Sequence, residues 1–142
     1  RIGNACGFWG DNVDAPIRLA EGTQLDYLTL EYLAELTMSI LALLRQRDPK
    51  GGYATDFIDV LDRLSSTLKT QPQLKIVTNA GGLNPKACAE QAQATLAKNG
   101  LQRKIGYITG DDLLPNLYTL IGQGHGFQHI DTGEPITKVR DK

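Results

Sequence analysis

The sequence is poor in residues that carry redox, metal or nucleophilic chemistry. It holds two cysteines, two histidines, one methionine and one tryptophan. Cys6 and Cys88 are too few for a disulfide framework, and although they could pair with each other, a reduced intracellular chain is the better interpretation. By default, we therefore expect a cytoplasmic protein.

Further absences narrow the classes of function. The formal net charge is −1, so no basic surface indicates nucleic acid or anionic lipid as a partner. No apolar run approaches the roughly 18 residues of a membrane span. We expect no signal peptide, because residues 1–4 include neither a methionine nor an apolar segment. The sequence also has no P-loop, no G-x-S-x-G elbow and no paired C-x-x-C. We expect neither nucleic acid nor a membrane among its partners.

What is present is typical of one globular α/β domain. Hydrophobic residues make up 41% and charged residues 22% of the 142 positions, which predicts a single domain over residues 1–142. Strand and helix patterns alternate, and this predicts a mainly parallel sheet built from βαβ units, with helices on both faces. The predicted strands are residues 25–32, 74–77 and 105–109, and the predicted helices are residues 14–22, 33–44, 55–68, 85–98 and 113–121. A loop-rich tail is predicted over residues 122–142.

Local signals support two of these helices. Asp14 can cap the first, and the second carries apolar side chains at the spacing of an amphipathic helix. Those side chains are Leu33, Leu36, Ile40, Leu43 and Leu44.

The most informative stretch is residues 75–85. A short apolar run indicates a buried strand, and residues 79–82 form a tight turn with two glycines. Asn84 is a good helix N-cap, and Pro85 suits the first helical position. Backbone N–H groups around Gly81, Gly82 and Asn84 would then suit a phosphate, a carboxylate or an enolate-like oxygen. A plain strand-to-helix turn is the alternative.

Polar or glycine-rich segments follow each strand of the expected sheet. Ligands of parallel sheets bind beyond the carboxyl ends of the strands, so these segments predict a site. They are residues 7–11, 31–32, 79–84 and 110–112. In the first, Gly7 would let the backbone approach a ligand, Trp9 would cover it and Asp11 would line it. The alternatives are that Trp9 fills the core and that Asp11 caps a turn.

Two carboxylates follow the last predicted strand directly. At least one of Asp111 and Asp112 should face the site, where it could bind Mg²⁺ or accept a proton. Capping of the next helix is the alternative.

The histidines and cysteines give weaker signals. His125, His129 and Asp131 have spacing that could hold a metal on a helix, but the surrounding glycines favour a solvated loop. Cys6 lies in a glycine-rich loop without a visible base, and Cys88 falls on the packing face of its helix.

Several blocks of sequence resemble the N-terminal region of the acyclic terpene utilisation protein A family. The blocks are GNACGFWGD at 3–11, DYL at 26–28, YLAELTM at 32–38, TNAGGLNP at 78–85, TGDD at 109–112 and HIDTGEP at 129–135. The resemblance implies a role in the breakdown of citronellol- and geraniol-type terpenes, which proceeds through acyl-CoA thioesters. It also implies that the chain is part of a longer family domain, so the partners would be the rest of that chain or a second copy.

The leading hypothesis is an enzyme, or a substrate-binding segment, for a small organic acid or an acyl-CoA thioester. Asn79 would orient the substrate, the glycine turn would hold an anionic oxygen, and Asp111 or Asp112 would act as acid/base or Mg²⁺ ligand. Hydration or dehydration of an unsaturated acyl group suits these parts. The alternatives are a non-catalytic ligand-binding or scaffold subunit and a Mg²⁺-dependent nucleotide or phosphate binder.

Overall fold

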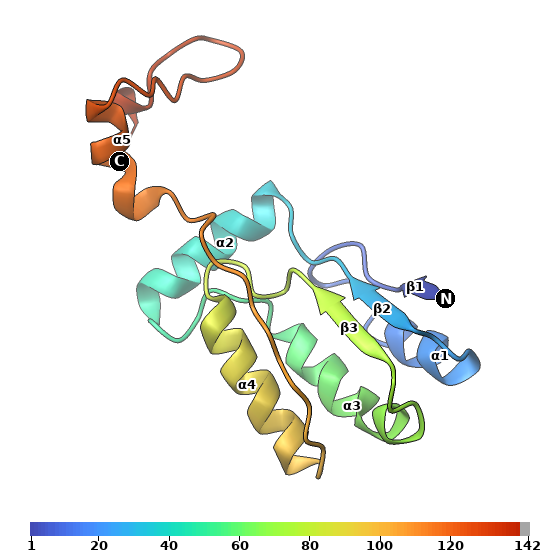
Figure 1. The fold of residues 1–142 in the computed structure, drawn as a ribbon. Helices are drawn as coiled ribbons and strands as arrows, with labels where there is room; N and C mark the ends of the chain where they lie inside the picture. Colours follow the sequence, from blue (N-terminus) through green and yellow to red (C-terminus); the bar gives the residue numbers. More distant parts are fainter. Residues whose placement is uncertain (140–142) are drawn as a thin grey trace. The chain divides into compact units, whose positions relative to one another are not determined.

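The computed structural model describes residues 1–139 and divides into two compact units (Figure 1). The first unit is Arg1–Ile108 and the second is Thr109–Lys142. The last three residues of the predicted tail lie outside the described residues. The assignment of residues 1–142 to a single domain stays a prediction.

The first unit is built on a small parallel sheet. Its elements in chain order are β1 (Ile2–Asn4), α1 (Ala15–Gly22), β2 (Tyr27–Leu30), α2 (Glu35–Arg47), α3 (Asp56–Thr70), β3 (Lys75–Thr78) and α4 (Pro85–Lys98). The strands are ordered β1-β2-β3, and both pairings are parallel. Gly3, Leu28 and Ile76 lie opposite one another across the sheet. The predicted α/β class with a parallel sheet is confirmed.

Helix α4 begins and ends where its sequence predicts. The Asn84 side chain accepts the N–H of Ala87 at 3.3 Å, and Pro85 occupies the first turn. The helix ends at Lys98, and Gly100 takes a φ of 70°, a left-handed conformation that favours glycine. The predicted helix cap at Asp14 is not formed. The Asp14 side chain makes no capping hydrogen bond and instead forms an ion pair with the guanidinium of Arg63 in α3.

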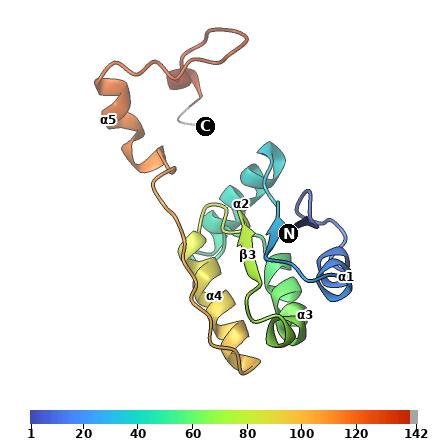
Figure 2. The same cartoon turned by 45° about the vertical axis from the view of Figure 1, so that its right-hand side comes forward.

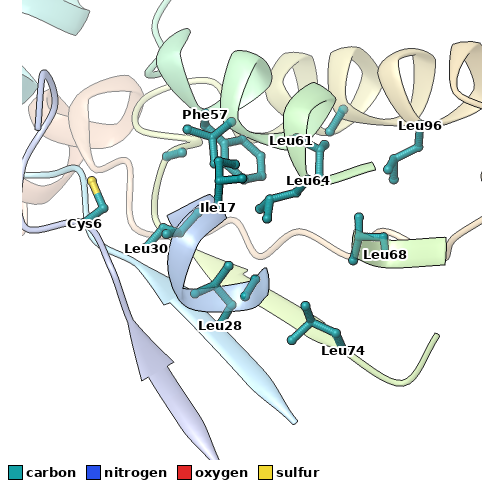
Figure 3. Packing of buried hydrophobic residues seen from close by; sticks show 14 of the residues in the cluster. Cys6, Ile17, Leu28, Leu30, Phe57, Leu61, Leu64, Leu68, Leu74 and Leu96 are labelled. Carbon is teal, nitrogen blue, oxygen red and sulfur yellow. The ribbon is translucent and has the colours of Figure 1, made fainter. Parts of the chain in front are cut away.

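One face of the sheet carries the hydrophobic core. Helix α1 packs against α3, and α3 packs against α4 (Figure 2). Leu28 of β2 and Leu64 of α3 are fully buried in this core. Figure 3 shows this cluster, which includes Leu30, Leu61 and Leu68.

The opposite face of the sheet is open in the described residues. Ile2, Tyr27 and Val77 point away from the core, and all three are exposed. The predicted cover of helices on both faces is therefore not confirmed.

The strand predicted at residues 105–109 is wrong, because the structure forms no strand there. The segment starts as an extended chain in which Leu101 is buried and Ile105 packs against the core, but Ile108 is exposed. It is held by side chains: the Arg103 guanidinium donates to the Leu68 carbonyl at 2.6 Å and to that of Pro72. A strand requires backbone pairing with a neighbour, and among the described residues β3 pairs with β2 and not with this segment. The unit expected from β3, α4 and this strand is therefore not formed.

The second unit contains short helices and a loop. These are η1 (Leu114–Asn116), α5 (Leu117–Gly122) and η2 (Ile136–Lys138). The helix predicted over residues 113–121 is thus divided, and Pro115, which lacks an N–H, lies in the 3₁₀ turn before α5. An antiparallel bridge joins Gln128 to Pro135. Across the described chain, every helix is too short or too polar to traverse a lipid bilayer.

Candidate functional site

The loops that follow β1, β2 and β3 form the carboxyl rim of the first unit. In this rim, Asn79 links the ends of β2 and β3: its Oδ1 accepts the N–H of Tyr32 at 2.8 Å, and its Nδ2 donates to the carboxylate of Glu31. The same Glu31 oxygen accepts the N–H of Leu33 at 2.9 Å. An exposed carboxylate is therefore fixed at the rim by two donors.

The loop after β1 is joined to the same place. The N–H of Trp9 donates to the carbonyl of Tyr32 at 3.2 Å. Asp11 organises the loop, since its carboxylate accepts the N–H of Gly7 at 2.9 Å and that of Asn12 at 2.7 Å. These two bonds, the one from Gly7 first, lower the pKa of Asp11. The Trp9 side chain is half-buried and packs against the core, while its backbone N–H makes the bond to Tyr32.

The turn after β3 uses most of its backbone donors internally. The N–H of Gly82 donates to the Asn79 carbonyl at 3.1 Å, and the N–H of Asn84 donates to the Gly81 carbonyl at 2.8 Å. The N–H of Leu83 donates to a carbonyl of the loop before α3, at 2.9 Å. In this turn and in the first turn of α4, the N–H groups of Gly81 and Lys86 donate to no acceptor among the described residues.

The two glycines of the turn are required by close packing. Gly82 has a φ of 49°, and a Cβ there would come within 2.5 Å of Leu41 and 2.9 Å of the Gly52 carbonyl. A Cβ at Gly81 would lie 2.8 Å from the Cα of Pro85. Gly82 therefore allows α2 and the loop before α3 to approach the end of β3, and Gly81 allows α4 to do so.

Asn84 has a structural role at both ends of its amide. Its Oδ1 caps α4, while its Nδ2 donates to the carbonyls of Pro49 at 3.1 Å and Gly51 at 2.9 Å. These bonds tie the loop before α3 to the beginning of α4.

The thiols are buried and protonated at neutral pH. Burial raises the pKa of Cys6, whose Sγ donates to the Phe8 carbonyl at 3.3 Å. Burial also raises the pKa of Cys88 to about 11. Neither thiol therefore has the depressed pKa of a nucleophile. Tyr32, whose pKa is raised by burial, packs edge-on against Phe57 with ring centres 6.3 Å apart.

Asp111 and Asp112 belong to the second unit, and both are exposed. Asp112 accepts the N–H of Leu114 at 3.1 Å, at the start of η1. In residues 1–139 no three His, Cys, Asp or Glu side chains are grouped so that they could hold a metal ion. The catalytic and Mg²⁺-binding roles of these aspartates stay predictions.

The histidine loop of the second unit is organised by its own backbone. The Nδ1 of His129 accepts the N–H of Asp131 at 3.1 Å and that of Thr132 at 3.3 Å. These bonds use one of the two ring nitrogens and give His129 a structural role in the loop.

The structure therefore brings together part of the predicted set. Trp9 and Asn79 are joined through Tyr32, and the glycine turn follows Asn79 directly. The rim also contains the carboxylate of Glu31, which was not among the predicted site residues. Its position at the end of a strand with an alternating pattern could have indicated it.

Comparison with known proteins gives one match. The model of a family described as "Acyclic terpene utilisation family protein AtuA" matches residues 1–142. Neither the curated proteins nor the solved structures give a match.

Proposed function

Since this chain belongs to the acyclic terpene utilisation family AtuA, we propose that it binds an acyl-CoA thioester or a small organic acid of that metabolism at the carboxyl rim. In this proposal the segments β1–α1–β2 and β2–α3–β3 act as βαβ units that bring three strand exits to one edge. The observation that carries it is the Glu31 carboxylate, held by Asn79 and by the N–H of Leu33.

The rim supplies a fixed proton carrier. A carboxylate can exchange a proton with a substrate when its position is set, and Asn79 sets that of Glu31. Asn79 is thus a positioning residue, because both ends of its amide are used within the protein. Trp9, whose N–H donates to the carbonyl of Tyr32 next to Glu31, would contact the hydrocarbon part of a substrate.

The anionic oxygen of the substrate would be bound at the start of α4. Of the predicted donors, the N–H of Gly81 is available, and the N–H of Lys86 joins it at the positive end of the helix dipole. Gly82 and Asn84 contribute by holding the shape of the turn. CoA enters as part of the substrate.

The reaction class that these groups suit is hydration or its reversal. Water adds its oxygen to Cβ of an unsaturated acyl group, one proton goes to Cα, and the thioester oxygen carries charge in between. Glu31 would take the proton from water and deliver it to Cα, and the α4 donors would stabilise the thioester oxygen between the two transfers.

Thermal melting with a ligand panel tests the proposal. The panel is CoA, a branched unsaturated acyl-CoA, ATP and phosphate, each with and without Mg²⁺. A ligand that binds the native protein raises the melting temperature by mass action. We expect the acyl-CoA to raise it, Trp9→Ala to reduce that rise, and Glu31→Gln to keep the rise but remove turnover of the acyl-CoA. Glu21→Gln on α1 is the matched control and should change neither.

A non-catalytic binding subunit is the second candidate. It is favoured by the internal use of most glycine-turn donors and by thiols that are buried and protonated. It predicts that the acyl-CoA shifts the melting temperature without being converted. A shift by ATP that requires Mg²⁺ would instead favour the nucleotide-binding alternative.

A further inference from the structure

The Glu31 carboxylate lies on the open face of the sheet. Side chains alternate between the two faces of an extended chain, and here Leu30 and Tyr32 are buried in the core while Glu31 between them is exposed. Asn79, whose amide donates to Glu31, precedes Ala80, which is fully buried. The candidate site at the carboxyl rim therefore continues onto the outward side chains of β2 and β3.

The outward side chains next to Glu31 form an apolar strip. Thr29 lies two positions before Glu31, and its partner across the sheet is Val77. Tyr27 lies two positions further back on β2. The Thr29 hydroxyl donates to the Gly3 carbonyl at 3.2 Å, so an apolar cover over Thr29 would leave no donor unpaired. We call Thr29, Val77 and Tyr27 the outer strip.

Charged groups end the outer strip. Lys75 is the partner of Tyr27 across the sheet, and its Nζ lies 5.2 Å from the centre of the Tyr27 ring and 3.4 Å from its hydroxyl. Lys75 and Asp26 line a hollow beside this ring. A hydrocarbon that extended into the hollow would gain little, because these charged groups have to stay in contact with water. The strip therefore has a defined length of about 13 Å, which is four residues at strand spacing from Glu31 to Tyr27.

A narrow ligand suits this surface better than a layer of protein. The core face of the same strand is wholly apolar, with Leu28 and Leu30, whereas the outer strip is bounded by the carboxylate of Glu31 and the ammonium of Lys75. A helix packed on the strip would take both charges out of water, which is costly. A single hydrocarbon chain would cover the strip and leave both charges solvated.

From the continuity of the strip with Glu31 and from its charged end, we infer that the outer strip binds the acyl chain of the substrate and sets its length. Val77 and Tyr27 are then specificity-determining residues, and the preferred acyl group is a medium-length chain that ends at Tyr27. The inference rests on the proposed function, because it requires a thioester whose reacting carbons lie at Glu31.

Titration calorimetry with a series of saturated acyl-CoAs tests the inference. The series is CoA itself and its butanoyl, octanoyl, dodecanoyl and hexadecanoyl thioesters, each below its micellar concentration; saturated chains cannot be hydrated. Affinity should rise roughly twofold for each added methylene, since a surface that is open on one side removes only part of each methylene from water. The rise should continue to the dodecanoyl chain and stop before the hexadecanoyl chain, where Lys75 ends the strip.

Variants of the strip should change this dependence on chain length. Val77→Thr keeps a β-branched side chain, which suits a strand, and should weaken dodecanoyl-CoA about threefold or more without changing the affinity for CoA. Lys75→Met removes the charged end, so the affinity should go on rising to hexadecanoyl-CoA. Lys69→Met removes an exposed cation of α3 and is the matched control, which should behave like the native chain.

Failure of the inference and failure of the proposed function give different results. If neither CoA nor any thioester binds, the proposed function is wrong and the inference falls with it. If the thioesters bind with an affinity that does not depend on chain length, the inference alone is overturned. It is also overturned if Val77→Thr and Lys75→Met, both shown to be folded by melting curves, keep the chain-length dependence of the native chain.

Discussion

The side chain of Asn79 holds the backbone of Tyr32, with 2.8 Å between Oδ1 and the N–H. The ladder between β2 and β3 ends at Leu30 and Thr78, which are two residues before Tyr32 and one residue before Asn79. Beyond that point the two chains separate into a helix and a turn, and Asn79 is the connection between them. It also binds Glu31, so the position of the rim carboxylate depends on the same amide.

Replacement of Asn79 by alanine should lower the free energy of unfolding by about 1–3 kcal/mol, because the part-buried N–H of Tyr32 loses its acceptor. Asn79→Asp keeps an acceptor but places a second carboxylate against Glu31. The loss in free energy of unfolding caused by Asn79→Asp should therefore be larger at pH 7 than near pH 4, where carboxylates begin to protonate. Urea unfolding at both pH values measures this. Asn12→Ala, which removes an exposed local bond, is the control and should change stability less.

Sequence patterns predict the ends of α4 because the determinants are local. The Asn84 cap, Pro85 and Gly100 act within one helical turn of the residues that they affect. The same holds for β2 and β3, whose apolar runs are short and bounded by polar residues.

Long-range packing explains what the patterns do not predict. The spacing of Leu36, Ile40 and Leu43 identifies a helix, but only the folded chain shows that this side faces solvent. Residues 105–109 have strand-like composition, yet a strand also needs a partner, and β3 is not hydrogen-bonded to them. In the candidate site, the glycine turn is recognisable, whereas the acceptor of the Leu83 N–H is Gly52, which lies in a distant part of the sequence.

Gly82→Ala should destabilise the first unit through a collision as well as through its backbone angle. A methyl group at this position would meet Leu41 and the Gly52 carbonyl, and overpacking of this kind costs about 1–3 kcal/mol. Gly100→Ala is the matched control, because Gly100 also has a positive φ but has open space around it. Gly100→Ala should lower the free energy of unfolding by roughly 1 kcal/mol, because only the left-handed backbone conformation is unfavourable for alanine. Equal losses in urea unfolding would contradict the packing account.

Cys88 should make the protein less stable in alkaline solution. Burial raises the pKa of its thiol from 9.0 to about 11, so the folded protein keeps this proton to a higher pH than the unfolded chain does. The stabilising contribution is complete below pH 9 and is lost as the pH rises towards 11. The slope from this group is at most about 1 kcal/mol per pH unit.

The Cys88→Ala variant should show a flatter decline between pH 9 and pH 11, whatever its stability at pH 7. The comparison uses urea unfolding at three alkaline pH values. Because burial also raises the pKa of Cys6, Cys6→Ala serves as the second variant. Parallel curves for the native chain and Cys88→Ala would show that this thiol does not titrate as described.

Arg103 should hold the extended segment after α4 against the first unit. Its guanidinium donates to the carbonyls of Leu68, in the last turn of α3, and of Pro72. Arg103→Ala should therefore lower the free energy of unfolding by about 1–3 kcal/mol, since charged donors to carbonyls are stronger than neutral ones. It should also speed amide hydrogen exchange at Gln71 and Leu74, whose backbone bonds lie beside those carbonyls. Lys104→Ala removes a neighbouring exposed cation and should affect neither quantity. If both variants exchange alike, Ile105 and not Arg103 anchors the segment.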